Sequence, residues 1–175
     1  MAVYRRLVDS SSFPSIVTDY SSENLHVNEA FRRFFGHVTP HAFASPMQNG
    51  TKYILFHPEA SSFLGAGDYA SFREYWLMPA LANLLAGWQQ RPGDPKLLQT
   101  LQEIKRRPKL LRAYEATPDW IRRSGDIHVN SDARPFQDPR TGKVRTLHIV
   151  TEGHQAYQPI ALSHVTFVLN DGPEP

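Results

Sequence analysis

The stretch from Pro14 to Gly36 constrains the fold of this chain most, because two predicted strands and a helix follow one another in it with little room between them. Ser15 to Thr18 has the β-branched content of a strand, and Leu25 to Asn28 alternates apolar and polar residues as a half-buried strand does. The polar residues between these two segments predict a turn. The chain therefore has to place a β-hairpin and the helix that follows it against one shared core.

Asn28 is predicted to mark the junction between the hairpin and this helix. Its side-chain oxygen can accept a hydrogen bond from a backbone N–H group of a helix that begins at Glu29, which makes it a suitable N-cap. Phe31 and Phe35 lie one turn apart in that helix, so both point to the same side, toward the core. Gly36 is predicted to end the helix.

The middle of the chain is predicted to be mainly helical. After an irregular loop from His37 to Gly50, Thr51 to Phe56 has the content of a strand, whereas Pro58 favours a short helix. Apolar residues then recur at helical spacing from Asp68, a predicted N-cap, to Gly87. This helix is predicted to be buried and to be kinked near Pro79.

Two further helices are each predicted to start at a proline. Asp94 is suited to cap a helix whose first residue is Pro95. Pro108 ends that helix and starts another, which carries Leu111 and Tyr114 on its apolar face. Both helices extend the helical part of the predicted fold.

Beyond Trp120 the spacing of apolar residues changes from helical to alternating, which indicates strands. The predicted strands are Ile127 to Val129, Val144 to Thr151 and Ala161 to Leu169, with a turn from Arg134 to Gly142. Together with the N-terminal hairpin they make a set of five. The sequence therefore predicts an α+β fold in which a five-stranded antiparallel sheet carries an enlarged helical cover.

The chain of 175 residues has the size and composition of one globular domain. We predict a connector helix in residues 1–13, the main domain in residues 14–170 and a tail in residues 171–175. Nineteen Lys and Arg against 17 Asp and Glu leave a formal charge of +2, which by itself does not indicate a nucleic-acid partner. The sequence has no cysteine and no stretch of about 18 apolar residues, so we expect a cytoplasmic protein that does not enter a membrane.

The order of these features resembles the ligand-binding, PAS-like domain of the MmyB-like bacterial transcription regulators. A hairpin that runs into a short helix is also typical of the start of PAS-type sensor domains. The resemblance covers the chain from about Leu7 to Asn170. The motifs that carry it are, in order, the hairpin and helix from Leu25 to Phe35, Asn49 followed by Phe56 to Ala60, the loop from Arg91 to Pro95, a helix with Leu97, Leu98, Leu101, Glu103 and Ile104, a short helix from Pro108 to Tyr114, and the turn at Gly142 before a closing apolar strand.

The resemblance implies a regulatory domain that binds a small, largely apolar molecule and passes a change to a DNA-binding domain or partner. Contact with DNA is then expected only indirectly, through a helix-turn-helix domain or partner. Two features depart from the family pattern. Tyr114 stands where tryptophan is more common, which implies a pocket of different shape, and the residues ahead of Pro14 are too few for a helix-turn-helix.

Ten residues are predicted to bind the ligand between the sheet and its helical cover, since ligand sites are typically apolar clefts with few polar anchors. We expect a fatty acid or similar amphiphile. Arg112 is the candidate counter-charge for its carboxylate. The ten residues are Phe31, Phe35, Phe56, Trp76, Leu84, Leu111, Arg112, Tyr114, Leu147 and Ile149.

Other functions stay open on the sequence. Aromatic and leucine stripes at helical spacing are also typical of plain core packing, so the alternative is a protein-interaction or dimerisation module with a filled core, including a homodimer. Haem or flavin sensing is a third hypothesis. The basic cluster from Lys105 to Arg123 is a solvated surface, a docking surface for an acidic partner, or a source of counter-charges for the ligand.

Neither catalysis nor a metal site is predicted. The chain has no GxSxG or GxGxxG motif and no cysteine nucleophile, so we expect no catalytic residues. His37 and His41 are four residues apart, but Pro40 between them disfavours a regular helix that would bring their side chains together. We therefore predict no cofactor other than a bound amphiphile.

Overall fold

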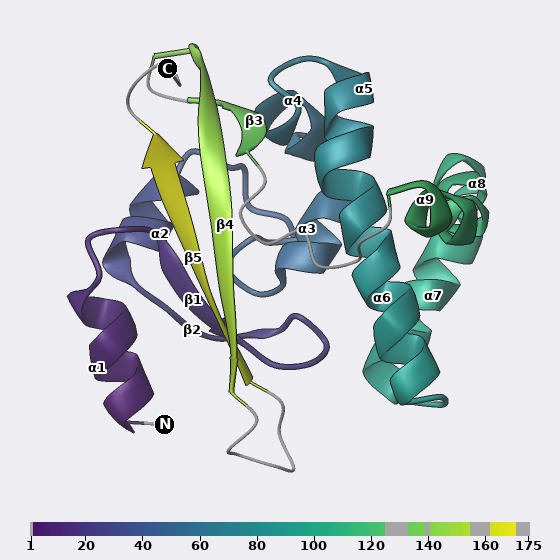
Figure 1. Ribbon diagram of the computed structural model, residues 1–175, viewed down its shortest axis with the longest axis horizontal. Coiled ribbons are helices and arrows are strands. Elements are labelled where there is room, and N and C mark those ends of the chain that lie inside the picture. Colours follow the sequence, from purple (N-terminus) through teal and green to yellow (C-terminus); the bar gives the residue numbers. More distant parts are fainter. Residues whose placement is uncertain (1, 125–132, 139–140, 155–161, 171–175) are drawn as a thin grey trace.

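The computed structural model describes residues 2–124, 133–138, 141–154 and 162–170, and these fold around one antiparallel sheet (Figure 1). The strand order is β2-β1-β5-β4-β3, and every neighbouring pair is antiparallel. The predicted α+β fold with a five-stranded antiparallel sheet is therefore confirmed. The strands are β1 (Ser15–Thr18), β2 (Asn24–Val27), β3 (Ala133–Gln137), β4 (Val144–His154) and β5 (Leu162–Asn170).

Asn28 joins the hairpin to helix α2 (Glu29–Phe34) as predicted. Its Oδ1 accepts a hydrogen bond from the backbone N–H of Phe31 at 2.8 Å, which makes Asn28 the N-cap. Phe31 and Phe35 are both buried. The helix ends at Phe34 with Phe35 as its C-cap, and Gly36 follows directly, at the position where a glycine commonly ends a helix.

Helix α1 (Ala2–Ser10) lies on the opposite side of the sheet from α3 to α9 (Figure 1). Val8 is fully buried there and forms a small core with Val17 and Leu162. Leu7, the apolar residue next to it, is 55% exposed. Neighbouring residues of a helix point about 100° apart, so a single short helix on the sheet buries only one of the two.

The remaining helices form the cover on the inner face of the sheet. In Figure 1, α3 to α6 lie nearer the sheet, and α7 to α9 pack on the far side of α6. The elements are α3 (Gly50–Phe56), α4 (Ala60–Leu64), α5 (Tyr69–Phe72), a π-helical segment η1 (Arg73–Leu77), α6 (Met78–Gln90), α7 (Pro95–Lys105), α8 (Pro108–Glu115) and α9 (Thr117–Ser124).

Residues 50–56, whose content suited either a strand or a helix, fold as helix α3. Asn49 explains the choice, because its side chain accepts a hydrogen bond from the backbone N–H of Lys52 at 2.8 Å and so caps the helix. The two helices predicted to begin at a proline do so. Helix α7 begins at Pro95 with Asp94 as its N-cap, and α8 begins at Pro108.

The helix predicted from Asp68 to Gly87 is interrupted by the π-helical segment η1. Asp68 is its N-cap, as predicted. Pro79 lacks an N–H group, and its ring clashes with the carbonyl four residues earlier in a regular α-helix. The turn before Pro79 widens, and the N–H of Met78 bonds to the carbonyl of Arg73, five residues back. The predicted kink is therefore a π-turn.

The segment after Tyr114 differs most from the prediction. Helix α9 was not expected, and β3 occupies Ala133–Gln137, where the sequence analysis placed a turn. Arg134 and Phe136 of this strand are buried and alternate with half-buried residues. The sequence does not show this alternation as a pattern of apolar and polar residues, because one of the two inward-facing residues is an arginine. The strand predicted from Ile127 to Val129 lies outside the described residues.

Strands β4 and β5 form the longest pair of the sheet. Both lie where they were predicted, although β4 continues to His154. Their inward side chains pack on the main core as expected, because residues two apart on a strand share a face. These side chains are Leu147, Ile149, Val165, Phe167 and Leu169.

Candidate ligand-binding cavity

A cavity of about 540 Å³ lies between the inner face of the sheet and the helical cover. Small-molecule sites commonly have volumes of roughly 300–1,000 Å³. Side chains of β1, β3, β4 and β5 form one wall, and side chains of α2, α3, α4, η1 and α6 form the other. The apolar and aromatic lining residues are Ile16, Tyr20, Phe31, Phe35, Pro46, Tyr53, Ile54, Leu64, Trp76, Pro79, Ala80, Ile149, Val165 and Phe167.

The strand register gives the cavity a long axis along the strands. Thr18 pairs with Ser163 at one end, and both line the cavity. At the other end Arg134 pairs with Leu147, which pairs with Leu169. Leu147 and Leu169 themselves do not line the cavity, and its lining on β5 runs from Ser163 to Phe167, four positions or roughly 13 Å at about 3.3 Å per residue. The lining is thus apolar along its length and polar toward both ends.

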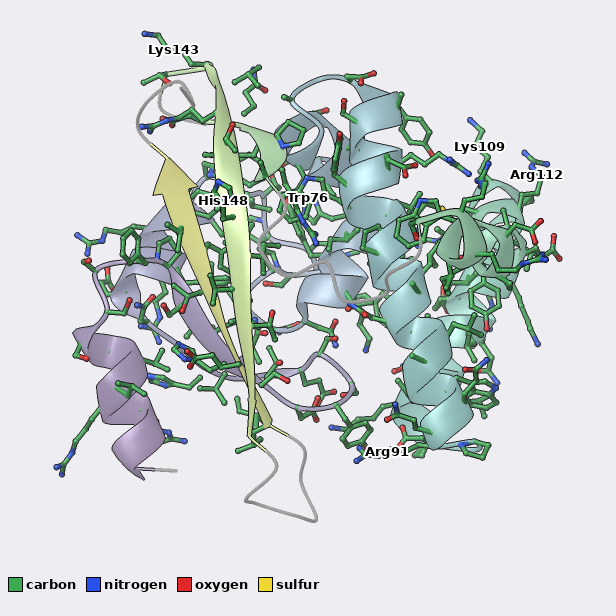
Figure 2. The ribbon with its side chains drawn as sticks, viewed as in Figure 1. Trp76, Arg91, Lys109, Arg112, Lys143 and His148 are labelled. Atoms are coloured by element: carbon green, nitrogen blue, oxygen red, sulfur yellow. The ribbon has the colours of Figure 1, made fainter. Side chains whose placement is uncertain are left out.

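Trp76 forms the helical wall near the Arg134 end and lies between the sheet and the helices (Figure 2). It belongs to the π-helical segment η1 and is 2% exposed. Its Nε1 donates a hydrogen bond to the carbonyl oxygen of Pro135 in β3 at 3.1 Å. This bond fixes the indole against the strand on which Arg134 lies.

Arg134 is a buried cation in the cavity wall. The side chain of Arg134 lies on the inner face of β3, and the residue is 6% exposed. Its guanidinium carbon lies 5.1 Å from the centroid of the Trp76 ring. A guanidinium is always charged and presents a planar set of donors that matches a carboxylate. Arg134 is not among the ten residues predicted to bind the ligand, because the predicted turn from Arg134 to Gly142 includes it. The alternation of Arg134 and Phe136 about Pro135 was the signal that could have found it.

Asp19 lies at the opposite end of the cavity, directly after β1. It is 8% exposed, and its carboxylate accepts hydrogen bonds from the backbone N–H groups of Ser21 and Glu23 and from Nζ of Lys96. Burial acts to raise the pKa of Asp19, but the hydrogen bonds from these three residues outweigh it. The net pKa is below its ordinary value, and the carboxylate is charged at neutral pH.

Tyr20 makes a second contact between the β1–β2 turn and the helical cover. Its hydroxyl donates to Oδ2 of Asp94 at 2.7 Å, and the guanidinium of Arg91 lies 3.9 Å from its ring centroid. The hydrogen bond raises the pKa of Tyr20 and lowers the pKa of Asp94. Arg91 lies at the lower end of α6 in Figure 2. We call this set of contacts the clasp; it comprises Asp19, Tyr20, Glu23, Arg91, Asp94 and Lys96.

Tyr53 lines the cavity from α3 and is 2% exposed. Its hydroxyl has no hydrogen-bond partner within the part of the chain that the structure describes. Burial raises the pKa of Tyr53, so the phenol is neutral at physiological pH and adds no charge to the wall.

The structure brings four of the ten predicted ligand residues together in the cavity wall: Phe31, Phe35, Trp76 and Ile149. Leu84 and Leu147 are buried in the core but do not line the cavity. Phe56 is also buried, and the guanidinium of Arg107 lies 4.7 Å from its ring centroid. The ligand-binding role of the four lining residues stays a prediction.

The three predicted residues of α8 lie away from the cavity. Leu111 and Tyr114 are half-buried, and Arg112 is exposed and points outward from the side of the molecule remote from the sheet (Figure 2). Arg112, the predicted counter-charge for a ligand carboxylate, therefore does not lie at the cavity. Helical spacing identifies the apolar face of a helix, but it does not say whether that face packs on the sheet or on another helix.

The structure describes residues 2–124, 133–138, 141–154 and 162–170, and neither a metal site nor a membrane-spanning helix is found among them. Within these ranges no group of three or more His, Cys, Asp or Glu side chains could hold a metal ion. None of the helices in the described part of the chain has the length and apolarity that crossing a lipid bilayer requires.

The strand order and the cavity between the sheet and its helical cover define the class of protein: a PAS-like ligand-binding domain. The chain belongs to the family described as the MmyB-like transcription regulator ligand binding domain, which it matches over residues 2–173. The resemblance found in the sequence is thereby confirmed, and the family is a regulatory one rather than a class of enzymes.

Comparison with solved structures finds similarity to the PAS domain of BvgS from Bordetella pertussis. The identity is 14%, the TM-score is 0.37, and the match covers 98% of this chain and 86% of that chain. No curated protein matches the sequence.

Proposed function

We propose that this ligand-binding domain senses a fatty acid or a similar single-chain amphiphile and passes its occupancy to a DNA-binding domain or partner. The observation that carries the proposal is the cavity of about 540 Å³, which is apolar along its length and has the buried cation Arg134 in its wall. A long apolar chain would replace water along the lining, and a terminal carboxylate would meet the guanidinium.

The charges in the cavity wall favour one orientation of such a ligand. Arg134 attracts a carboxylate at its end of the cavity, whereas the charged Asp19 repels one at the other end. The acyl chain would then run along Phe167, Val165 and Ile16 toward the clasp. An amphiphile is therefore preferred over a hydrocarbon of the same length, which gains nothing from the cation.

The cavity also distinguishes this proposal from its alternative. A dimerisation module with a filled core has no need of a cavity of about 540 Å³ between sheet and helices. Formation of a homodimer remains a separate prediction, which sedimentation at several protein concentrations would test. The proposal includes a cytoplasmic setting and no haem or flavin, and a visible absorption spectrum of the purified protein tests the latter.

The clasp gives a route by which occupancy would reach the helical cover. It links the β1–β2 turn, at one end of the cavity, to Asp94 and Lys96 at the start of α7. A ligand shifts a conformational equilibrium only by its differential affinity for the two states. An acyl chain that reaches this end would bind with different affinity to the state in which the contacts of the clasp are formed and to the state in which they are broken.

Binding is tested with delipidated protein and two matched probes, palmitic acid and hexadecanol, by isothermal titration calorimetry. Thr151 lines the cavity from β4, whereas Thr146 lies on the same strand with its side chain on the opposite face. Thr151→Trp should fill the cavity and weaken palmitate binding by about tenfold or more, a change of about 1.4 kcal/mol. Thr146→Trp should stay within about twofold of the wild type.

The role of Arg134 is tested by the preference for acid over alcohol. The wild type should bind palmitate about tenfold more tightly than hexadecanol, and Arg134→Met should abolish that preference while the alcohol still binds. Binding of the alcohol shows that the variant is folded. Absence of any acyl ligand from native mass spectra, together with equal behaviour of the two tryptophan variants, would overturn the proposal.

A further inference from the structure

The positive charge of this chain is concentrated in one short segment. Residues 104–123 carry seven Lys or Arg and two Asp or Glu, whereas the whole chain carries 19 and 17. The segment therefore has a formal charge of +5, and the rest of the chain has a formal charge of −3. The seven residues, here called the basic face, are Lys105, Arg106, Arg107, Lys109, Arg112, Arg122 and Arg123.

All seven side chains of the basic face are exposed, on the end of α7 and on α8 and α9. These helices lie on the far side of α6 from the sheet, and Lys109 and Arg112 point out from that side of the molecule (Figure 2). Only Arg106 and Arg122 have a carboxylate partner among the described residues, Glu103 and Asp119 respectively, each three positions away on the same helix. The fold thus leaves most of this charge for an external anion.

The start of α8 adds to this positive potential. Arg107 is its N-cap and Lys109 lies in its first turn, which has no acidic residue. The N-terminus of a helix is the positive end of its dipole, so cations placed there are unfavourable for the isolated domain. A bound polyanion would remove that repulsion.

The partner that fits this surface is a phosphate backbone rather than a protein. Exposed large hydrophobic side chains occur elsewhere on the described surface, for example Leu98, Tyr75 and Val150, but none occurs in residues 104–124. Protein interfaces are typically enriched in aromatic and apolar residues at their centre. Five of the seven cations are arginines, which match phosphate oxygens in a bidentate manner, and binding to a DNA backbone requires charge alone.

We propose that the basic face contacts the phosphate backbone of duplex DNA. The family to which the chain belongs is one of transcription regulators, so a duplex is within reach of the domain when the regulator is on its DNA. The face lies across the molecule from α1 (Figure 1). It would contribute affinity without reading sequence, since phosphate contacts position a protein but do not specify bases.

The test is fluorescence anisotropy of a labelled duplex of about 30 base pairs and arbitrary sequence, titrated with the 175-residue chain at about 50–200 mM salt. We expect a dissociation constant of about 10–100 µM at the lower salt, with a log–log salt slope of about −0.9 for each phosphate contacted. Lys109→Glu combined with Arg112→Glu should weaken binding about tenfold or more and reduce the slope by about 2.

Arg32→Glu combined with Arg33→Glu is the matched control, because it changes the net charge equally on the exposed face of α2. It should bind DNA within about twofold of the wild type. Equal weakening by both double variants would overturn the proposal, since net charge alone would then explain binding. Tighter binding of poly-glutamate than of the duplex would also overturn it, in favour of an acidic protein partner.

Discussion

Nζ of Lys96, in the first turn of α7, lies 3.1 Å from Oδ2 of Asp19, the residue that follows β1. The same ammonium contacts the carboxylate of Glu23, immediately before β2. The hydrogen bonds that Lys96 donates to Glu23 and Asp19 raise the pKa of Lys96, although partial burial opposes them. One side chain of the helical cover therefore holds both sides of the β1–β2 turn at the end of the cavity.

Lys96→Ala should lower the free energy of unfolding by about 1–2 kcal/mol, and the melting temperature by about 2–6 °C. The variant leaves the buried carboxylate of Asp19 without its cation. This loss of unfolding free energy is smaller than for a fully buried ion pair. The Lys96 side chain is 42% exposed, so solvent screens its attraction to the carboxylate. Urea unfolding at pH 7 measures the change.

Lys105→Ala provides the control for this prediction. Lys105 lies in the last turn of the same helix, is exposed, and has no carboxylate partner among the described residues. Its replacement should change the free energy of unfolding by less than about 0.5 kcal/mol. Equal stability of the two variants would show that the contact between Lys96 and Asp19 contributes nothing.

The contribution of Asp19 should disappear in acid. Its pKa is lower in the folded chain than the value of about 3.9 in an unfolded one, so the folded state binds fewer protons. The stability due to the charged carboxylate is therefore present above about pH 4 and is lost as the pH falls through the folded pKa. The difference in unfolding free energy between the wild type and Asp19→Asn should be constant from pH 7 to about pH 5 and shrink toward pH 2. A difference that grows in acid would contradict this sign.

Asn28→Asp should lower the free energy of unfolding much more than an exchange of asparagine for aspartate usually does at an N-cap, where both residues are favourable. Oδ1 of Asn28 caps α2 and also accepts from the N–H of Ser15 at 3.0 Å, roles that an aspartate keeps. An aspartate loses the amide donor, however, and brings a carboxylate against carbonyl oxygens in a site that is 1% exposed. We expect a loss of about 3 kcal/mol or more in the free energy of unfolding. The carbonyls that accept from Nδ2 of Asn28 are those of Val8, Ser11 and Phe13.

Asp68→Asn is the comparison for this prediction, because Asp68 caps α5 at an exposed position and, among the described residues, its side chain accepts only from Ala70 and Ser71. An asparagine keeps one oxygen that can accept from the N–H of Ser71, and it is as favourable at an N-cap as an aspartate, so the variant should unfold close to the wild type. Similar unfolding of Asn28→Asp and Asp68→Asn in urea would show that Asn28 acts only as a cap.

The sequence by itself determined those elements whose sequence patterns span only a few neighbouring residues. Several features depend on neighbouring residues alone, and all of them are found in the structure. They are the hairpin, the cap at Asn28, the helices that begin at Pro95 and Pro108, and the two long C-terminal strands. Period-two alternation likewise identified Leu147 and Ile149 as inward residues, because the two faces of a strand are fixed by the backbone.

Only the tertiary structure decided which of these elements surround the cavity. The residues of α8 have the same apolar spacing as those of α6, yet α8 packs on the far side of α6, so Leu111 and Tyr114 lie away from the cavity. Arg134 and the clasp were missed for a related reason. Arg134 meets Trp76, and Asp19 meets Lys96, across separations of 58 and 77 residues that no local pattern records. Such contacts follow from how the sheet and its cover pack, which is a property of the whole chain.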